Sequence, residues 1–394
     1  MENAHFERIC REIDSDRQYI IDLRRYFHSH PELSAKEYGT AEKIERELDI
    51  IGLPHTRVGE TGVFAEIKGN DDGKIIVLRA DTDALPVNEE HECAYKSQNA
   101  GVMHACGHDA HTAALIGAAR VLSKNRDLFF GTVRLCFQQG EEIGYGARLF
   151  VDGGYLDGGT RTFGVHLASY IDVGKVSVTP GPNNASVDWF KITVHGVGAH
   201  ISEPQNGVDA AYIISKISAK AKELCKKTAS PVDDILVGIG KITAGTAYNV
   251  IADKAVAEGT VRVYSPKVRQ KVQKKINDIA NSTAEKYGGR ADIEWRDFTS
   301  PLINDEKASS DMQKCTAALF GKENVITDLA PRLAGDDFAE FVIKVPGTYA
   351  YVGSRNKDVP ETCVSHHNSH FDIDERCIDI AVKLYVFSAL DHLK

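Results

Sequence analysis

The sequence predicts an α/β protein whose mixed-sheet main domain is interrupted by a smaller inserted domain. Its 394 residues exceed what one core usually holds, so more than one domain is expected. Strand-like segments alternate with helical periodicity over residues 5–167, which favours a partly parallel sheet. The turn-rich stretch PGPNNAS at residues 180–186 then ends this pattern, and helices and an apolar strand resume only after Pro301.

The elements of the main domain follow from local signals. Apolar residues at helical spacing predict a helix over residues 5–28, which stops at Pro31 because proline disfavours helix before it. A second helix fits residues 36–51 and ends at Gly52. Further helical segments are predicted at 110–122 and around 147–151, and strands at 62–69, 74–81, 132–137, 162–167 and 348–353.

The middle of the chain predicts a compact domain of its own. Its elements follow the order strand, helix, strand, strand, helix, strand, which is a ferredoxin-like unit (βαββαβ). The predicted strands are 187–196, 235–245, 250–265 and 291–298, and the helices are 207–224 and 266–289. We therefore expect a first catalytic part at 1–183, an inserted domain at 184–300 and a second catalytic part at 301–394.

Composition limits the partners and the location. A formal charge of -9 argues against nucleic acid as a partner and favours a small substrate. No apolar run reaches the roughly 20 residues that cross a bilayer, and acidic residues stand where a signal peptide would be basic, so a cytoplasmic protein without membrane contact is expected. The eight cysteines lack paired spacing, which predicts free thiols.

The stretch VMHACGHDAH at residues 102–111 concentrates groups that bind metals. The side chains that bind a metal must converge from rigid elements. In α/β sheets, binding sites form at the carboxyl ends of the strands. Asp81, Asp83, Glu141, Glu142 and His166 all follow or close predicted strands. The candidate ligands on residue type are Cys106, His108, Glu142, His166 and His367. In a two-metal hydrolase, one carboxylate of the Glu141–Glu142 pair would bind an ion and the other would take a proton from metal-bound water.

Two other interpretations compete with a catalytic metal site. Cys106 can act as a nucleophile activated by His104 or His108, although this leaves the two glutamates and His166 unused. A non-catalytic metal-binding or peptide-binding protein would keep the ligands but has no need of Glu141.

Nine ordered blocks between about residues 24 and 375 carry a family resemblance. They are RYFHSHPELSAKE, VLRADTDALPV, GVMHACGHDAHTAALIGAARVL, FQQGEEIGYGA, FGVHL, VHGVGAHISEPQNGVDAA, YNVIAD, AGDDFAEF and HNSHFDIDE. In these blocks the chain resembles the amidohydrolases of the M20 metallopeptidase clan, in the subfamily of hippurate hydrolases, N-acyl-amino-acid aminoacylases and auxin-conjugate hydrolases.

The resemblance implies a di-metal aminopeptidase-like catalytic domain with an inserted lid that also forms a homodimer. It implies that a Cys106 thiolate bridges two divalent ions, one held by His108 and His166 and the other by Glu142 and His367. It makes Glu141 the general base and Asp83 the acid that orients a ligand. Asp81 occupies a neighbouring position without a defined role.

In the lid, His200 corresponds to the histidine that reaches the partner subunit's active site and stabilises the oxyanion. Asn249, from the YNVIAD block, and Arg262, on its chemistry alone, are expected to bind the substrate carboxylate.

Two positions depart from the family pattern. Ser369 replaces a proline common in relatives. His366 and His370 flank His367, which is chosen by its spacing to Phe371, with His366 as the alternative ligand. Asp336 stands where relatives usually have glutamate, which leaves open any contact that needs the longer side chain.

The expected reaction is hydrolysis of a small N-acyl amino acid, or of a related aminoacyl conjugate or dipeptide, by a metal-bound water that Glu141 activates. The expected cofactor is two divalent ions per subunit, zinc or manganese, with cobalt or nickel as further options. The sequence leaves the acyl group and the amino acid open.

Overall fold

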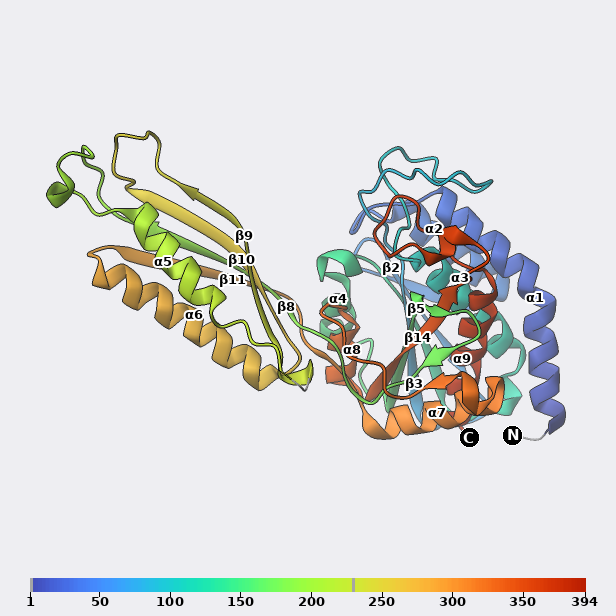
Figure 1. Cartoon of the computed structure of the whole chain (residues 1–394). Coiled ribbons are helices and arrows are strands. Elements are labelled where there is room, and N and C mark those ends of the chain that lie inside the picture. The colour runs from blue at the N-terminus through green and yellow to red at the C-terminus, as the bar shows by residue number, and fades with distance from the viewer. Residues whose placement is uncertain (1–2, 229–230) are drawn as a thin grey trace. The chain divides into compact units, whose positions relative to one another are not determined.

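The computed structural model describes residues 3–228 and 231–394 and divides into two compact units (Figure 1). The larger unit contains the chain up to Gly181, Ile303–Leu329 and Asp337–Lys394. The smaller unit contains Pro182–Leu302 and Ala330–Asp336. The mixed α/β class expected from the sequence is confirmed in both the elements and the main sheet.

An eight-stranded mixed sheet forms the centre of the larger unit, in the order β1-β2-β4-β3-β5-β14-β6-β13. Strand β3 lies parallel to both β4 and β5, and β5 lies parallel to β14, so these four strands end at the same edge. The strands are β1 (His55–Val58), β2 (Gly62–Lys68), β3 (Ile75–Asp81), β4 (Thr132–Gln138), β5 (Arg161–Asp172), β6 (Val176–Ser177), β13 (Val325–Ile326) and β14 (Gly347–Arg355).

Helices cover both faces of this sheet. Helices α1 (Asn3–Ser29), α3 (His108–Lys124) and α9 (Arg376–His392) lie on one face, and α4 (Gly146–Asp152) and α8 (Phe338–Lys344) lie on the other (Figure 1). The remaining helices of this unit are α2 (Tyr38–Ile51) and α7 (Glu306–Phe320). Helix α3 is buried almost all round, and its alanines let α1, α9 and the sheet approach closely on opposite sides.

The smaller unit follows the βαββαβ order expected from the sequence. Its antiparallel sheet has the order β11-β8-β10-β9, with α5 and α6 on one face (Figure 1). The elements are β8 (Val187–His195), α5 (Ala210–Lys222), β9 (Ile235–Ala244), β10 (Lys254–Val263), α6 (Pro266–Lys286) and β11 (Arg290–Thr299). A separate pair of strands, β7 (Gly181–Asn184) and β12 (Leu302–Asn304), contains the points where the chain leaves and re-enters the larger unit.

The segment Ala330–Asp336 joins the smaller unit, which the sequence did not indicate. The backbone N–H of Ala185 donates to the carbonyl of Arg332 over 3.0 Å, and the Tyr264 hydroxyl donates to the carbonyl of Pro331 over 3.2 Å. The acceptors of both hydrogen bonds are backbone carbonyls, which every residue has, so the residue types alone do not predict these contacts.

No helix formed by residues 3–228 and 231–394 combines the length and the apolar character that crossing a bilayer requires.

Candidate metal centre

The carboxyl ends of three neighbouring parallel strands bring the predicted polar residues together. Asp81 ends β3, Glu141 follows β4 after a short turn, and His166 lies in β5. Helix α3 begins at His108, two residues earlier than the sequence predicts, directly after Gly107. Gly107 has φ 91°, a left-handed conformation that favours glycine and directs the chain from the ligand-rich loop into the helix.

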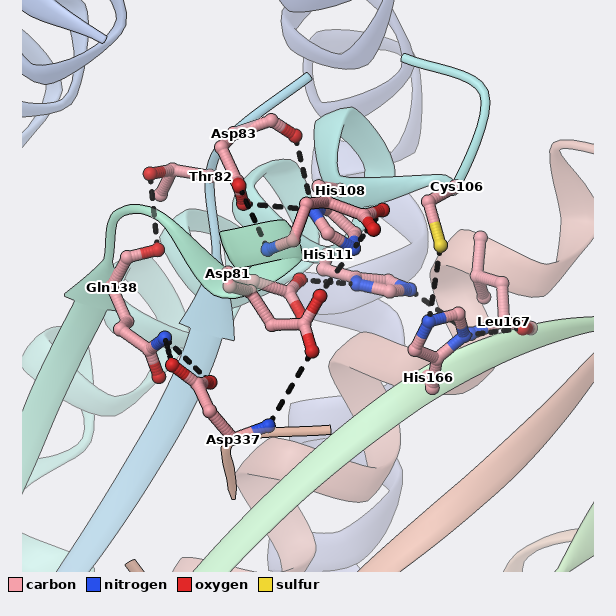
Figure 2. Close-up of polar contacts among 12 residues, drawn as sticks. Asp81, Thr82, Asp83, Cys106, His108, His111, Gln138, His166, Leu167 and Asp337 are labelled. Carbon is pink, nitrogen blue, oxygen red and sulfur yellow. Dashed lines mark hydrogen bonds and ion pairs between the residues drawn. The ribbon is translucent and has the colours of Figure 1, made fainter. Parts of the chain in front are cut away.

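Two groups of possible ligand atoms share one sulfur. The first group is Cys106, His108 and His166, and the second is Cys106, Glu142 and His367. Within each group the ligand atoms all lie within 4.8 Å of one another. Cys106 Sγ lies 3.5 Å from His166 Nε2 (Figure 2), and His367 Nε2 lies 3.3 Å from Glu142 Oε1. The geometry therefore matches two ligand sets joined at Cys106.

Hydrogen bonds on the outer ring nitrogens fix how the histidines point. His108 Nδ1 donates to Asp83, 3.0 Å from its carbonyl oxygen and 3.1 Å from Oδ1. His166 Nδ1 donates to the carbonyl of Leu167 over 2.6 Å (Figure 2). Each ring therefore presents its Nε2 lone pair to the cluster, as a metal-binding imidazole must.

Buried polar atoms test whether these residues suit a cation. His108 Nε2 and Glu142 Oε1 are buried without a hydrogen-bond partner among the described residues, and they lie 3.9 Å apart. Buried polar atoms are normally satisfied, so both atoms fit the role of ligands. A donor set of one sulfur, three imidazoles and one carboxylate matches what zinc and related transition metals bind.

Charges around the cluster also suit a cation. Burial alone lowers the pKa of His108, but the carboxylates of Asp81, Asp83 and Glu142 raise it to about 10. Burial lowers the pKa of His166 well below its usual value, so this ring is neutral. The same carboxylates that stabilise the protonated form of His108 would also stabilise a divalent ion bound at its Nε2 in place of the proton.

Cys106 is a poor nucleophile in this setting. Burial, followed by the nearby Glu142 and Glu141 carboxylates, raises the pKa of its thiol well above the usual value. A nucleophilic cysteine needs a lowered pKa. His104, one of the two proposed bases, is itself buried, and burial lowers its pKa to about 4.

Asp81 and Asp83 have different contacts. Asp83 Oδ1 accepts from His108, and its Oδ2 accepts the backbone N–H of Glu142 over 3.0 Å, so it orients two candidate ligands. Asp81 Oδ1 accepts from His111 Nδ1 over 2.6 Å, and its Oδ2 accepts from Arg79 over 2.7 Å. Asp81 thus holds neighbouring side chains.

Glu141 lies next to the cluster but outside both cysteine-containing groups. One of its carboxylate oxygens is within 4.8 Å of the ligand atoms of His108 and Glu142. The backbone N–H of Asp337 lies 3.4 Å from Glu141 Oε1. Glu141 therefore has a carboxylate beside the ligands that neither cysteine-containing set uses.

Sequence reasoning missed Arg79 and Asp337. The buried Arg79 donates to Asp81 and, over 2.8 Å, to Asp337 Oδ1. Gln138 Nε2 donates to the same oxygen of Asp337 over 2.7 Å (Figure 2). Asp337 was visible only as part of the AGDDF block. Its role depends on a partner 258 positions away in the chain, which no local pattern could reveal.

The choice between His366 and His367 now has a geometric basis. His366 Nδ1 lies 3.2 Å from the carbonyl of Cys106, and its Nε2 accepts the backbone N–H of Ser169 over 3.3 Å. Both ring nitrogens of His366 therefore contact backbone groups. His367 has a left-handed φ of 64° and a side chain 52% exposed, with its Nε2 beside Glu142. This geometry favours His367 as the ligand.

The remaining predicted residues belong to the smaller unit. His200 is exposed, with Nδ1 2.7 Å from the Ser202 hydroxyl, and the carbonyl of Asn249 accepts the N–H of Ile201 over 3.1 Å. His200 and Asn249 thus lie on adjacent backbone segments. Arg262, in β10, donates to the carbonyl of Leu333 over 3.1 Å, and burial lowers its pKa.

Known proteins match this chain over most of its length. The profile described as peptidase family M20/M25/M40 matches residues 77–390. An N-acetyl-L-cysteine deacetylase of Bacillus subtilis is 38% identical over 360 residues, covering 91% of this chain and 84% of that relative. Thermostable carboxypeptidase 2 of Saccharolobus solfataricus is 34% identical, covering 98% of each chain.

The crystal structure of the Bacillus subtilis YXEP protein, described as a dinuclear metal binding peptidase from the M20 family, has the same fold. Its TM-score is 0.84 at 33% identity, covering 96% of this chain and 99% of that one. These matches agree with the resemblance found in the sequence blocks. The chain belongs to peptidase family M20/M25/M40 and is a hydrolase that acts on amide bonds.

Proposed function

We propose that this chain cleaves the amide bond of small N-acyl amino acids, or of related aminoacyl conjugates or dipeptides, to release a carboxylic acid and a free amino acid. The observation that carries the proposal is the position of the Glu141 carboxylate. It lies beside the two ligand sets that share Cys106, and it belongs to neither of them. A binding protein has no use for such a group, whereas a hydrolase needs it as a general base.

The ligands in this proposal are Cys106 in both sets, with His108 and His166 in one and Glu142 and His367 in the other. Two bound divalent ions would supply the positive charge that polarises the amide carbonyl and lowers the pKa of a water molecule. The thiolate and imidazole donors favour zinc, while the carboxylate also suits manganese, and cobalt or nickel fit the same donors.

Glu141 takes the proton of the attacking water, whose oxygen forms the new bond to the carbonyl carbon. The same proton then passes from Glu141 to the nitrogen as the C–N bond breaks, which leaves an acid and an amine. Asp83 positions His108 and Glu142 by its two carboxylate oxygens throughout.

Three residues of the smaller unit have proposed roles in substrate binding and catalysis. His200 would donate to the developing oxyanion, and Asn249 and Arg262 would bind the carboxylate of the amino acid. The deacetylase and carboxypeptidase names of the relatives support a substrate with an amino-acid carboxylate next to the cleaved amide.

We further propose that the chain forms a homodimer through the smaller unit. Strand β9 is an edge strand of the sheet, and its last five residues, 240–244, are exposed. An unpaired strand edge can pair with the same strand of a second chain. In such a dimer His200 would act in the partner's site, as the family resemblance implies.

Elemental analysis of the purified protein, combined with a panel of N-acetyl amino acids, N-benzoyl amino acids and dipeptides, tests the proposal. We expect about two divalent ions per chain and hydrolysis of one acyl class that a chelator abolishes. Chelator-resistant hydrolysis that a thiol reagent stops would support the Cys106 nucleophile instead. Metal binding without hydrolysis of any substrate would support a binding protein.

A further inference from the structure

The block RYFHSHPELSAKE has no role in the chemistry described so far. Its last five residues, Leu33–Glu37, connect α1 to α2 and lie beside the candidate metal centre. Two of these residues contact groups that hold the candidate ligands and the general base. Neither residue belongs to a group of possible ligand atoms among the described residues.

Ser34 contacts the carboxylate that organises one side of the centre. Its hydroxyl donates to Asp83 Oδ2 over 2.7 Å, and the same oxygen accepts the N–H of Glu142 over 3.0 Å. The other oxygen of Asp83 accepts from His108 Nδ1. Ser34 therefore fixes the rotation of a carboxylate that aims both His108 and Glu142.

Glu37 contacts the turn that carries the general base. It is fully buried, and its Oε1 accepts the N–H of Gly140 over 2.9 Å. Gly140 directly precedes Glu141 and has a left-handed φ of 61°. The N–H of Ala35 donates to the same oxygen over 2.9 Å, and the Thr61 hydroxyl donates to Oε2 over 2.7 Å. The Glu37 carboxylate thus accepts three hydrogen bonds, one of them from Gly140 in the turn that carries Glu141.

The backbone of this segment supports a specific placement. Ala35 has φ 60°, and it is one of two described non-glycine residues with a positive φ, the other being His367. A left-handed alanine is strained and persists only where surrounding contacts hold it. The bond from its N–H to Glu37 is such a contact.

We infer that Ser34 and Glu37 are positioning residues of the active site, Ser34 for the ligands His108 and Glu142 and Glu37 for the general base Glu141. This inference rests on the proposed function for the role of Glu141. Ser34 acts through Asp83, and Glu37 acts through the backbone of Gly140. The two residues therefore affect different steps, metal binding and proton transfer.

Four variants separate these roles. Ser34→Ala and Glu37→Ala remove the contacts, while Ser34→Thr and Glu37→Gln keep a hydroxyl donor and an amide oxygen acceptor. Glu32→Ala is the matched control, because Glu32 directly precedes this segment and its side chain, among the described residues, accepts from Gly39 and Thr40 at the start of α2. It should lower the melting temperature without altering the centre.

The readouts are cobalt(II) affinity by chelator competition, the thiolate absorption of the cobalt-loaded protein, amide exchange of the peptide containing Gly140, and kcat on the preferred N-acyl amino acid. Ser34→Ala should weaken cobalt binding about 10-fold or more and change the absorption. Glu37→Ala should leave cobalt binding unchanged, speed exchange at Gly140 and lower kcat about 10- to 100-fold at constant KM. Ser34→Thr and Glu37→Gln should restore most of each loss.

The inference is overturned if Ser34→Ala and Glu37→Ala alter these readouts no more than Glu32→Ala does. If Glu37→Ala does not fold, Thr61→Val is used in its place, because this variant removes only the hydroxyl that donates to Glu37 Oε2. Unchanged amide exchange at Gly140 and unchanged kcat in Thr61→Val would exclude the role of Glu37. Absence of any amide hydrolysis by the wild type would refute the proposed function, while cobalt binding and amide exchange would still decide what Ser34 and Glu37 hold.

Discussion

At the residue scale, the candidate centre depends on Cys106 more than on any other side chain. Its sulfur belongs to both ligand groups, and each of the other ligands belongs to one of these two groups. Carboxylates and burial keep the thiol protonated in the absence of a cation, because they raise its pKa. Metal binding must therefore release the thiol proton, which makes affinity fall at acidic pH.

Replacing the shared ligand should differ from replacing an unshared one. Cys106→Ala should lower the metal content after dialysis from about two ions to near zero, while His367→Ala should leave about one. The physical reason is that His108 and His166 still form a pair around the first position when His367 is absent. Elemental analysis of both variants checks this, and equal metal loss in the two would contradict a bridging role for Cys106.

Glu141 should affect turnover and leave the metals in place. Glu141→Gln should lower kcat about 10²- to 10⁴-fold, because the amide cannot accept a proton from water. Metal content should equal that of the wild type, since Glu141 belongs to neither cysteine-containing ligand group. The measurement is steady-state kinetics with elemental analysis on the same sample. A variant that loses metal would make Glu141 a ligand instead.

The buried His104 should make stability depend on pH. Burial lowers its pKa from 6.5 to about 4, and neither ring nitrogen has a hydrogen-bond partner among the described residues. Between these two values the unfolded chain binds a proton that the folded chain does not. The stabilisation is therefore complete above pH 6.5 and is lost as the pH falls towards 4.

For metal-free protein, the free energy of unfolding should fall from pH 7 to pH 5 by about 2 kcal/mol more in the wild type than in His104→Gln. Urea unfolding at both pH values measures the difference. Equal pH dependence in the two proteins would show that His104 is protonated in the folded state.

At the element scale, helix α1 anchors two of the segments that carry candidate ligands. The buried guanidinium of Arg24 lies 2.9 Å from Asp109, next to His108, and 2.7 Å from Asp372, five residues after His367. These two ion pairs connect the first helix of the chain to the first turn of α3 and to the segment that follows His367. Burial would raise the pKa of Asp109, but Arg24 and His28 hold it well below the usual value.

Two adjacent arginines of α1 should differ strongly in their contribution to stability. Arg24→Met should lower the free energy of unfolding by about 3 to 5 kcal/mol, because it leaves the buried carboxylates of Asp109 and Asp372 without the positive charge of their arginine partner. Arg25→Met is the control: Arg25 pairs with Glu375 over 2.7 Å but is 41% exposed, so the cost should be about 0 to 1 kcal/mol. Urea unfolding measures both, and similar costs would contradict the network.

The elements differ in how well the sequence predicted them. Long helices and central strands followed from periodicity, as for α1 and the βαββαβ unit. Strands β1, β6, β7 and β13 have two to four residues each, which is too short for an alternating pattern to appear. The start of α3 at His108 also escaped prediction, because Gly107 sets it by its left-handed backbone.

At the scale of the whole molecule, the proposed homodimer gives an experiment on where His200 acts. Glu141→Ala and His200→Ala chains should each be nearly inactive. If His200 acts in the partner subunit's site, mixing and reassociating the two should restore about one quarter of wild-type activity, because half of the dimers are mixed and each contains one complete site. If His200 acts within its own chain, the mixture should stay inactive.

The sequence by itself determined the α/β class, the order of elements and the chemical groups available, because periodicity and residue type are local properties. It also carried the family resemblance. The tertiary structure places Cys106 in two ligand groups, as the resemblance implies. It alone decided that Asp81 binds Arg79 and His111, and that both nitrogens of His366 contact backbone groups. The physical reason is that the direction of a side chain depends on its second contact, and for His108 and His366 that contact lies 25 to 260 positions away in the chain.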